Sequence, residues 1–485
     1  MPELGLEATP ANGQETRNAL SGVDVSTSKV HVCDADFQEL VPDDSAYFTV
    51  GVFFDGTLNN AANTQARLEY ENKQAGRPYD RDQAKVYNTW YTFQKSGSYD
   101  NDFSNVARMQ RAYEEIIEDD NYQIPIYIEG IGTEDHESDS GILGAAQGLG
   151  ATGVRAKVLK GCEEVVDVIK QKQVEKISCL RIDTYGFSRG AAAARNFVFE
   201  IKKNKGDFKK MGGGRARTKI YHQVPNGYLG ELLEENGIEV NMVQVRFVGL
   251  YDTVASLGIN HDNDTRELNL DAVRKANHTF QIAADDEHRV NFRLTNINSA
   301  GSKGVQKELP GVHSDIGGGY TDNSNEEVTL NYANTIFGVP ELRRQRQRLI
   351  EEGWYLEDEI TAGWLSKELT AKRTGIRNTY SHIPLHIMVQ YSITKQLAYD
   401  LGLIQDQFSI EGDELTQAKS RVDDYVFYGG AKFSYDNIAD REIIRKLRNR
   451  YFHFSAHYDD KVVGLIAPHK PNFIDGERTR VIQNG

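Results

Sequence analysis

A strand-to-helix junction near the middle of the chain constrains the fold most. The apolar run Ile177–Tyr185 has the length of a buried strand, and four alanines from residue 191 favour a helix. Between them stands Gly186-Phe187-Ser188-Arg189-Gly190, a G-x-S-x-G motif. Its glycines permit a sharp turn that lifts the serine oxygen above the sheet edge. The motif therefore predicts an exposed nucleophile. The alternative is that Ser188 only caps the helix.

Strand and helix patterns alternate on both sides of this junction. Strands are predicted at 47–54, 124–128 and 243–251, a helix at 154–169, and another from a Ser104 cap to about Ile117. The alternation favours an α/β-hydrolase-like fold: a mostly parallel sheet with helices on both faces, plus added helical or cap elements. The polar stretch Asn59–Asp102 reads as a long loop or lid.

The chain divides into three predicted parts. Residues 1–44 are polar with little apolar periodicity and form an irregular N-terminal arm. Residues 45–325 form the catalytic core. Residues 326–485 form a C-terminal helical and short-strand portion, with helices at Pro340–Glu352 and Leu356–Lys372 and short strands in the last forty residues.

Charge and cysteine content exclude several classes of protein. Lys and Arg total 56 against 71 Asp and Glu, a net charge of −15, which argues against a nucleic-acid partner. No apolar run reaches the length of a membrane span, and the first residues lack the features of a signal peptide, so we expect synthesis in the cytoplasm. The three cysteines, Cys33, Cys162 and Cys179, are far apart, which argues against disulfides and a zinc site.

One basic stretch stands out in this acidic chain. Residues 202–219 hold eight Lys or Arg and one acid, Asp207. We hypothesise that the stretch faces anionic lipid headgroups, since a basic residue near such a surface contributes about 1 kcal/mol. The alternative is a solvated loop.

A serine nucleophile needs a base, and the base needs an orienting acid. The best acid is Asp252, just past the strand at 243–251, because ligands bind at the carboxyl ends of parallel strands. The best base is His313, in a glycine-rich segment. Simpler readings are a helix cap for Asp252 and a backbone-bonded loop histidine for His313. Competing bases are His261, His278 and His288.

The segment Phe53-Phe54-Asp55-Gly56-Thr57 has two chemical readings. It resembles the start of haloacid-dehalogenase phosphatases, but Phe53 stands where that chemistry needs a nucleophilic aspartate, so we reject this reading. We favour a turn whose Gly56 and Thr57 supply an oxyanion-hole N–H, together with the N–H of Arg189. The alternative is an ordinary Asp-Gly turn.

Taken together, the motifs resemble the first family of type VI secretion lipase effectors. They are FFDGTLNN at 53–60, GAAQGLGATG at 144–153, GFSRGAAAAR at 186–195, GLYDTVAS at 249–256 and PGVHSDIGGGY at 310–320. The resemblance covers roughly residues 47–325. It implies a Ser-Asp-His triad of Ser188, Asp252 and His313, and a C-terminal portion at 326–485 that shapes lipid access. That family usually has Trp before the aspartate, where this chain has Tyr251. The resemblance does not indicate whether the sn-1 or the sn-2 acyl chain is removed.

The resemblance also implies a biological role. It implies an antibacterial phospholipase A that needs no cofactor or metal. Such an enzyme is delivered by type VI secretion into the target-cell periplasm, where it attacks membrane phospholipid. Its implied partners are a type VI spike protein, which the arm at 1–44 would contact, and a cognate immunity protein. The alternatives are a soluble serine esterase or thioesterase and, from another class, an adaptor or structural component with a vestigial hydrolase motif.

Overall fold

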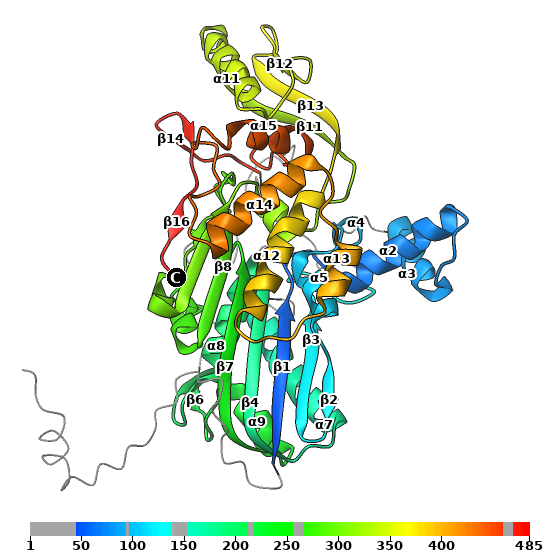
Figure 1. The fold of residues 1–485 in the computed structure, drawn as a ribbon, viewed down its shortest axis with the longest axis vertical. Helices are drawn as coiled ribbons and strands as arrows, with labels where there is room; N and C mark the ends of the chain where they lie inside the picture. The colour runs from blue at the N-terminus through cyan, green and yellow to red at the C-terminus, as the bar shows by residue number, and fades with distance from the viewer. Residues whose placement is uncertain are drawn as a thin grey trace, which may run out of the picture. The chain divides into compact units, whose positions relative to one another are not determined.

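A seven-stranded sheet organises the part of the chain that the computed structural model describes, namely residues 45–93, 97–137, 139, 153–211, 218–255, 265–458 and 469–485. The strand order is β10-β8-β7-β4-β1-β3-β2 (Figure 1). The strands are β1 (Ala46–Phe54), β2 (Ile116–Glu118), β3 (Asn121–Ile128), β4 (Lys176–Phe187), β7 (Glu239–Tyr251), β8 (His278–Ala284) and β10 (Gly304–Leu309). Neighbours pair in parallel except β2 with β3. The predicted α/β-hydrolase-like fold is confirmed, and each predicted strand is present.

Helices cover both faces of this sheet, which explains why its central strands are apolar on both sides. One core lies under α7 (Val154–Gln171), α8 (Arg189–Ile201) and α9 (Gly227–Glu235), and receives Phe48, Val50, Val52 and Phe54 of β1. On the opposite face, Phe53 joins the core beneath α5 (Asn105–Ala112), α12 (His382–Ile393) and α14 (Asp413–Phe427). Figure 1 shows α12 and α14 lying across the strands.

Residues beyond 325 thus form part of the layer over the sheet. Phe280 of β8 stacks on Tyr391 of α12 with ring centroids 3.9 Å apart, and the hydroxyl of Tyr185 in β4 donates to Ser392 at 3.0 Å. Residues before and after position 325 therefore share the hydrophobic core on this face of the sheet. The predicted role of the C-terminal portion in lipid access stays a prediction.

The predicted loop at Asn59–Asp102 is wrong, because much of it is helical. It contains α2 (Ala61–Gln74), α3 (Arg81–Phe93) and α4 (Gly97–Asp100). Asn60 caps α2 by accepting the Asn63 N–H at 3.1 Å, and Asp80 accepts the N–H groups of two residues at the start of α3. These helices carry few apolar residues, so the expected periodicity was too weak to detect, and the caps were the usable signal.

The predicted helix at Leu356–Lys372 is also wrong. Residues there form β12 (Ile360–Ala362) and the start of β13 (Glu368–Ile376), which pair antiparallel, and β11 (Ser324–Tyr332) pairs with β13 on its other edge. In β13 the buried residues Leu369, Ala371 and Arg373 alternate with more exposed ones, a period of two that defines a strand. The helix predicted next to it is present as α11 (Val339–Glu351).

The remaining elements are short. They include β5 (Phe208–Met211), β6 (Thr218–Tyr221), β9 (Leu294–Thr295), α10 (His313–Gly317), α13 (Leu401–Gln407), α15 (Arg441–Arg450), β14 (Phe473–Ile474), β15 (Glu477–Arg478) and β16 (Ile482–Gln483). Helix α5 ends at Ala112, earlier than predicted, because β2 begins at Ile116. The arm at 1–44 and most of the glycine-rich segment at 144–153 lie outside the described residues. Among the described helices, none is both long and apolar enough to cross a membrane.

Candidate active site

Ser188 occupies a strained turn between β4 and α8. Its φ and ψ are 58° and −124°, a region that residues other than glycine rarely adopt and that is found at functional sites. A Cβ atom on Gly186 would lie 2.4 Å from the carbonyl oxygen of Gly190, so the turn cannot close with a larger residue there. The predicted sharp strand-turn-helix is therefore present at the carboxyl edge of the sheet.

Asp252 lies on the neighbouring strand end. In the register of β4 and β7, Phe187 pairs with Tyr251, so Ser188 and Asp252 are the next residue on each strand. The Ser188 N–H donates to the Tyr251 carbonyl at 3.0 Å, and the Val254 N–H donates to the Ser188 carbonyl at 3.3 Å. These two hydrogen bonds fasten the serine turn to the aspartate turn. Asp252 also has a positive φ, of 46°.

His313 meets Asp252 directly. The Nδ1 atom of the imidazole lies 2.5 Å from Oδ2 of Asp252, and the ring packs between Phe187 and Phe292, with centroids 4.6 and 4.8 Å away. His313 is 4% exposed and Ser188 6%, so both are buried, and the predicted exposure of the nucleophile is wrong because neighbouring residues cover the turn. Burial lowers the pKa of His313, against the opposing effect of Asp252. An Nδ1 proton held by the carboxylate leaves Nε2 as the basic atom of a neutral imidazole.

The Asp252 carboxylate has a second charged partner that the sequence reasoning missed. Arg480 donates from Nη1 to Oδ1 at 2.6 Å and from Nη2 to Oδ2 at 2.8 Å, and the Ala284 N–H donates to Oδ1 at 2.9 Å. Burial alone would raise the pKa of Asp252, but Arg480 and His313 outweigh it and lower the pKa to about 2. Asp252 is therefore a carboxylate at neutral pH.

A second buried carboxylate lies behind His313. Glu287 accepts the His313 backbone N–H at 3.3 Å and binds the Arg289 guanidinium through both oxygens, at 2.9 and 2.8 Å. The hydroxyl of Ser455 also donates to it. Burial opposes ionisation of Glu287, but Arg289 outweighs burial and holds its pKa well below the usual range. This ion pair fixes the start of α10, and with it the position of His313.

The predicted oxyanion segment lies beside the serine turn. A Cβ atom on Gly56 would lie 2.5 Å from the Phe187 ring, so the 56–57 turn touches the residue before Ser188. The Gly56 N–H already donates to Oδ1 of Asp55 at 2.6 Å. The hydroxyl oxygen of Thr57 is buried without a hydrogen-bond partner among the described residues. Arg189 is the first residue of α8. The Gly56 N–H is therefore already engaged, and the oxyanion role of Thr57 and Arg189 stays a prediction.

Asp55 is a buried structural acid. Its Oδ2 accepts the hydroxyl hydrogen of Tyr127 at 2.6 Å, and together with the Gly56 bond this ties the loop after β1 to β3. Burial raises the pKa of Asp55 to about 6, although hydrogen bonds from Ser104 and Tyr127 oppose the shift. These contacts anchor the oxyanion segment.

Of the competing histidines, the two that the structure describes, His278 and His288, do not contact Asp252. His278 begins β8, at the amino end of the sheet, opposite Ser188. His288 lines a separate cavity of about 350 Å³. His261 lies outside the described residues.

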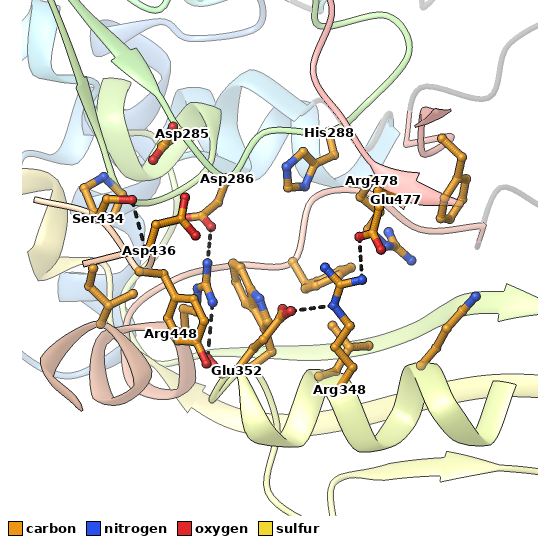
Figure 2. A pocket seen from close by; sticks show the side chains of 18 of the residues that line it. Asp285, Asp286, His288, Arg348, Glu352, Ser434, Asp436, Arg448, Glu477 and Arg478 are labelled. Carbon is orange, nitrogen blue, oxygen red and sulfur yellow. Dashed lines mark hydrogen bonds and ion pairs between the residues drawn. The ribbon is translucent and has the colours of Figure 1, made fainter. Parts of the chain in front are cut away.

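That cavity contains ion pairs such as Arg448–Asp286 at 2.7 Å, and neither Ser188 nor His313 lines it (Figure 2). Asp286 and His288 face it, while Glu287 between them binds His313 from the other side of the loop. Successive side chains of this loop thus point to opposite sides, and the loop separates the cavity from the candidate active site. No cluster of His, Cys, Asp or Glu with metal-binding geometry occurs in the described part of the chain.

The described residues of the basic stretch, 202–211 and 218–219, lie far from Ser188. The stretch follows the C-terminal end of α8, which runs back along the sheet, so β6 appears at the lower end of the strands in Figure 1. Lys203 pairs with Glu200 and Lys209 with Glu231, each at 2.5 Å. These two lysines are held by internal ion pairs, and part of the stretch, at 212–217, lies outside the described residues, so the headgroup hypothesis stays a prediction.

Comparison with known families identifies the family of this chain. A sequence model of the type VI secretion system phospholipase effector Tle1-like catalytic domain matches residues 87–337, more than half of the chain. The chain belongs to this Tle1-like effector family. The family's matched region contains Ser188, Asp252 and His313, but not Arg480 or the segment at 53–60.

Solved structures give a similar picture. The fold resembles that of a Tle1 effector determined in complex with the VgrG spike of the type 6 secretion system, with a TM-score of 0.60 and 20% identity over 95% of this chain and 99% of that one. An uncharacterised protein from Pseudomonas aeruginosa matches with a TM-score of 0.39 and 16% identity over 80% of this chain and 51% of that one. No curated protein matches the chain.

Proposed function

We propose that this member of the Tle1-like family is a phospholipase A that hydrolyses acyl esters of membrane glycerophospholipids through Ser188, Asp252 and His313. The observation that carries the proposal is the Asp252–His313 hydrogen bond at 2.5 Å, fastened by backbone hydrogen bonds beside the strained Ser188 turn. A nucleophile on a strained turn and an acid-oriented histidine are the parts that acyl transfer requires.

The chemistry then follows the serine hydrolase scheme. The Ser188 oxygen bonds to the acyl carbon while Nε2 of His313 takes its proton, and Asp252 stabilises the resulting imidazolium. His313 returns the proton to the glycerol oxygen as the ester bond breaks, which releases lysolipid and leaves an acyl-serine. A water molecule, activated by the same base, releases the fatty acid. The N–H of Arg189 and the Thr57 turn stabilise the oxyanion in both steps.

The decisive assay uses phospholipid vesicles. We expect the wild type to release lysolipid and fatty acid, and Ser188→Ala to lose this activity by several orders of magnitude without a change in the unfolding midpoint. His313→Ala and Asp252→Asn should lose most activity. Hydrolysis of small soluble esters alone would support the esterase alternative. No hydrolysis of either substrate would support the adaptor.

The setting of the reaction is part of the proposal. We infer delivery by a type VI spike protein into the periplasm of a target bacterium, and protection of the producer by an immunity protein that covers Ser188. Support comes from the family membership and from the solved relative bound to VgrG. Expression with a periplasmic export signal should kill a naive bacterium, and Ser188→Ala should remove the lethality. Equal growth of the two strains would count against an antibacterial lipase.

A further inference from the structure

Arg480 lies far from the serine motif in sequence but contacts the acid of the proposed triad. We propose that Arg480 is a positioning residue that holds the Asp252 carboxylate directed at His313, so that residues 480–483 complete the active site. This inference rests on the proposed triad. It goes further by assigning a catalytic requirement to a segment outside the 87–337 region that defines the family match.

The Arg480 side chain is held at every nitrogen. Besides the two bonds to Asp252, Nε donates to the Phe292 carbonyl at 2.9 Å and Nη1 donates to the Ala284 carbonyl at 3.0 Å. Only 7% of the side chain is exposed. A planar guanidinium that binds both oxygens of a carboxylate fixes the orientation of that carboxylate and also balances its charge. A lysine ammonium supplies the charge but cannot fix the orientation in the same way.

The backbone around Arg480 is docked next to the same turn. Strand β16 pairs in parallel with β9, where Ile482 faces Leu294. The Leu294 N–H donates to the Val481 carbonyl at 3.0 Å, and the Thr295 N–H donates to the Thr253 carbonyl at 2.9 Å. A continuous set of backbone hydrogen bonds thus joins the residues after Arg480 to the residue after Asp252.

The charge of Arg480 has a definite effect on the pair. The charged groups facing Asp252 and His313 are Glu287, Arg289 and Arg480. Without Arg480, a buried Asp252 keeps only His313 and the Ala284 N–H as partners. Its carboxylate would then bind the imidazolium without a competing cation, and the pKa of His313 would rise. The loss of two hydrogen bonds would also free the carboxylate to rotate away from Nδ1.

The test compares the full-length wild type with Arg480→Gln and Arg480→Lys on phosphatidylcholine vesicles between pH 4 and 9. We expect Arg480→Gln to lose about 10- to 100-fold in kcat/KM. A loss of this size is typical when a residue that orients a metal-binding side chain is removed, and Arg480 orients Asp252 in a comparable way. The acid limb of its pH profile should move up by about one pH unit. Arg480→Lys should keep the wild-type limb and recover only part of the rate. Millimolar guanidinium should partly restore Arg480→Ala.

Arg478→Gln is the matched control. Arg478 lies two residues earlier and is equally buried, but donates to the carbonyls of Ala456 and Leu330. For Arg478→Gln we expect a lower unfolding midpoint with an unchanged pH profile.

Wild-type kcat/KM and an unshifted pH profile in Arg480→Gln would overturn the proposal. If that variant does not fold, wild-type kcat/KM in folded Arg480→Lys would overturn it. A Ser188→Ala protein as active as the wild type would instead refute the triad.

Discussion

The backbone of Gly190 lies so close to Asp55 that a Cβ atom at position 190 would be 2.2 Å from the Asp55 carbonyl oxygen. The first turn of α8 and the end of β1 therefore meet backbone to backbone beside Ser188. This contact explains the second glycine of the G-x-S-x-G motif, since it serves the approach of two elements as well as the turn itself.

Gly190→Ala should disrupt this contact. The added methyl group must displace either β1 or α8, so we expect the free energy of unfolding to fall by about 1–3 kcal/mol and kcat to fall with it. Thermal unfolding and vesicle hydrolysis measure the two effects. Gly97→Ala is the control, because the nearest atom to its new methyl group is 3.9 Å away. Equal behaviour of the two variants would contradict the packing argument.

The pH dependence of activity should show the burial of His313. Burial lowers the pKa of this imidazole below its usual value, so the active neutral form persists into mildly acidic solution. We expect the acid limb of kcat/KM to have its midpoint below the usual histidine value of about 6.5. Phosphatidylcholine is the suitable substrate, because its headgroup charge is constant over this range. A midpoint above 7 would contradict the assignment of His313 as the base.

Asp55 should make the folded protein less stable as pH rises, whereas a salt-bridged acid makes it more stable as pH rises. Its folded pKa, about 6, is above that of the unfolded chain, so the native state binds more protons between pH 4 and 6, and stability falls as pH rises through this range. Asp55→Asn cannot titrate and should lack this slope, so its stability relative to the wild type should rise by about 2 kcal/mol from pH 4 to pH 7. Urea unfolding at several pH values measures the difference. Parallel curves for the two proteins would refute it.

Glu287→Gln should destabilise the protein strongly, because it leaves the buried Arg289 without its counter-charge. Removing one partner of such a pair costs about 3–5 kcal/mol. Since Glu287 has a lowered pKa, its contribution is present at neutral pH and is lost as pH falls below about 4. Glu327→Gln, which breaks an exposed pair with Lys372, should leave the unfolding midpoint unchanged. A Glu287→Gln midpoint equal to the wild type would contradict the prediction.

Sequence reasoning went furthest where a local pattern determines the structure or suggests a site residue. The alternation of strands and helices identified the sheet, and Ser188, Asp252 and His313 could be chosen because each stands at a strand end or in a glycine-rich segment. It failed for Arg480 and Glu287. Their roles depend on a segment that returns to the sheet from far along the chain, and no spacing rule connects them to Asp252 or His313.

The errors in secondary structure have a similar origin. Helix α2 buries little apolar surface, so its cap at Asn60 was a better signal than hydrophobic periodicity. Strand β13 is rich in charged residues, and its alternation was missed because Arg373 is buried by an ion pair with Glu326 rather than by apolar contact. Tertiary partners, which the sequence does not display, decided both cases.

The course of α8 has a practical consequence. A helix of this length carries the chain about 20 Å from Ser188 toward the opposite edge of the sheet, where the β5–β6 hairpin begins. A fluorophore, an affinity handle or a solid support coupled to that hairpin would therefore leave the serine edge free. Cys162 and Cys179 are buried, so neither would compete with a cysteine introduced there, and Cys33, which lies outside the described residues, would be replaced by serine. The hairpin is thus the natural attachment point for measuring, on a single immobilised molecule, how the enzyme meets a lipid bilayer.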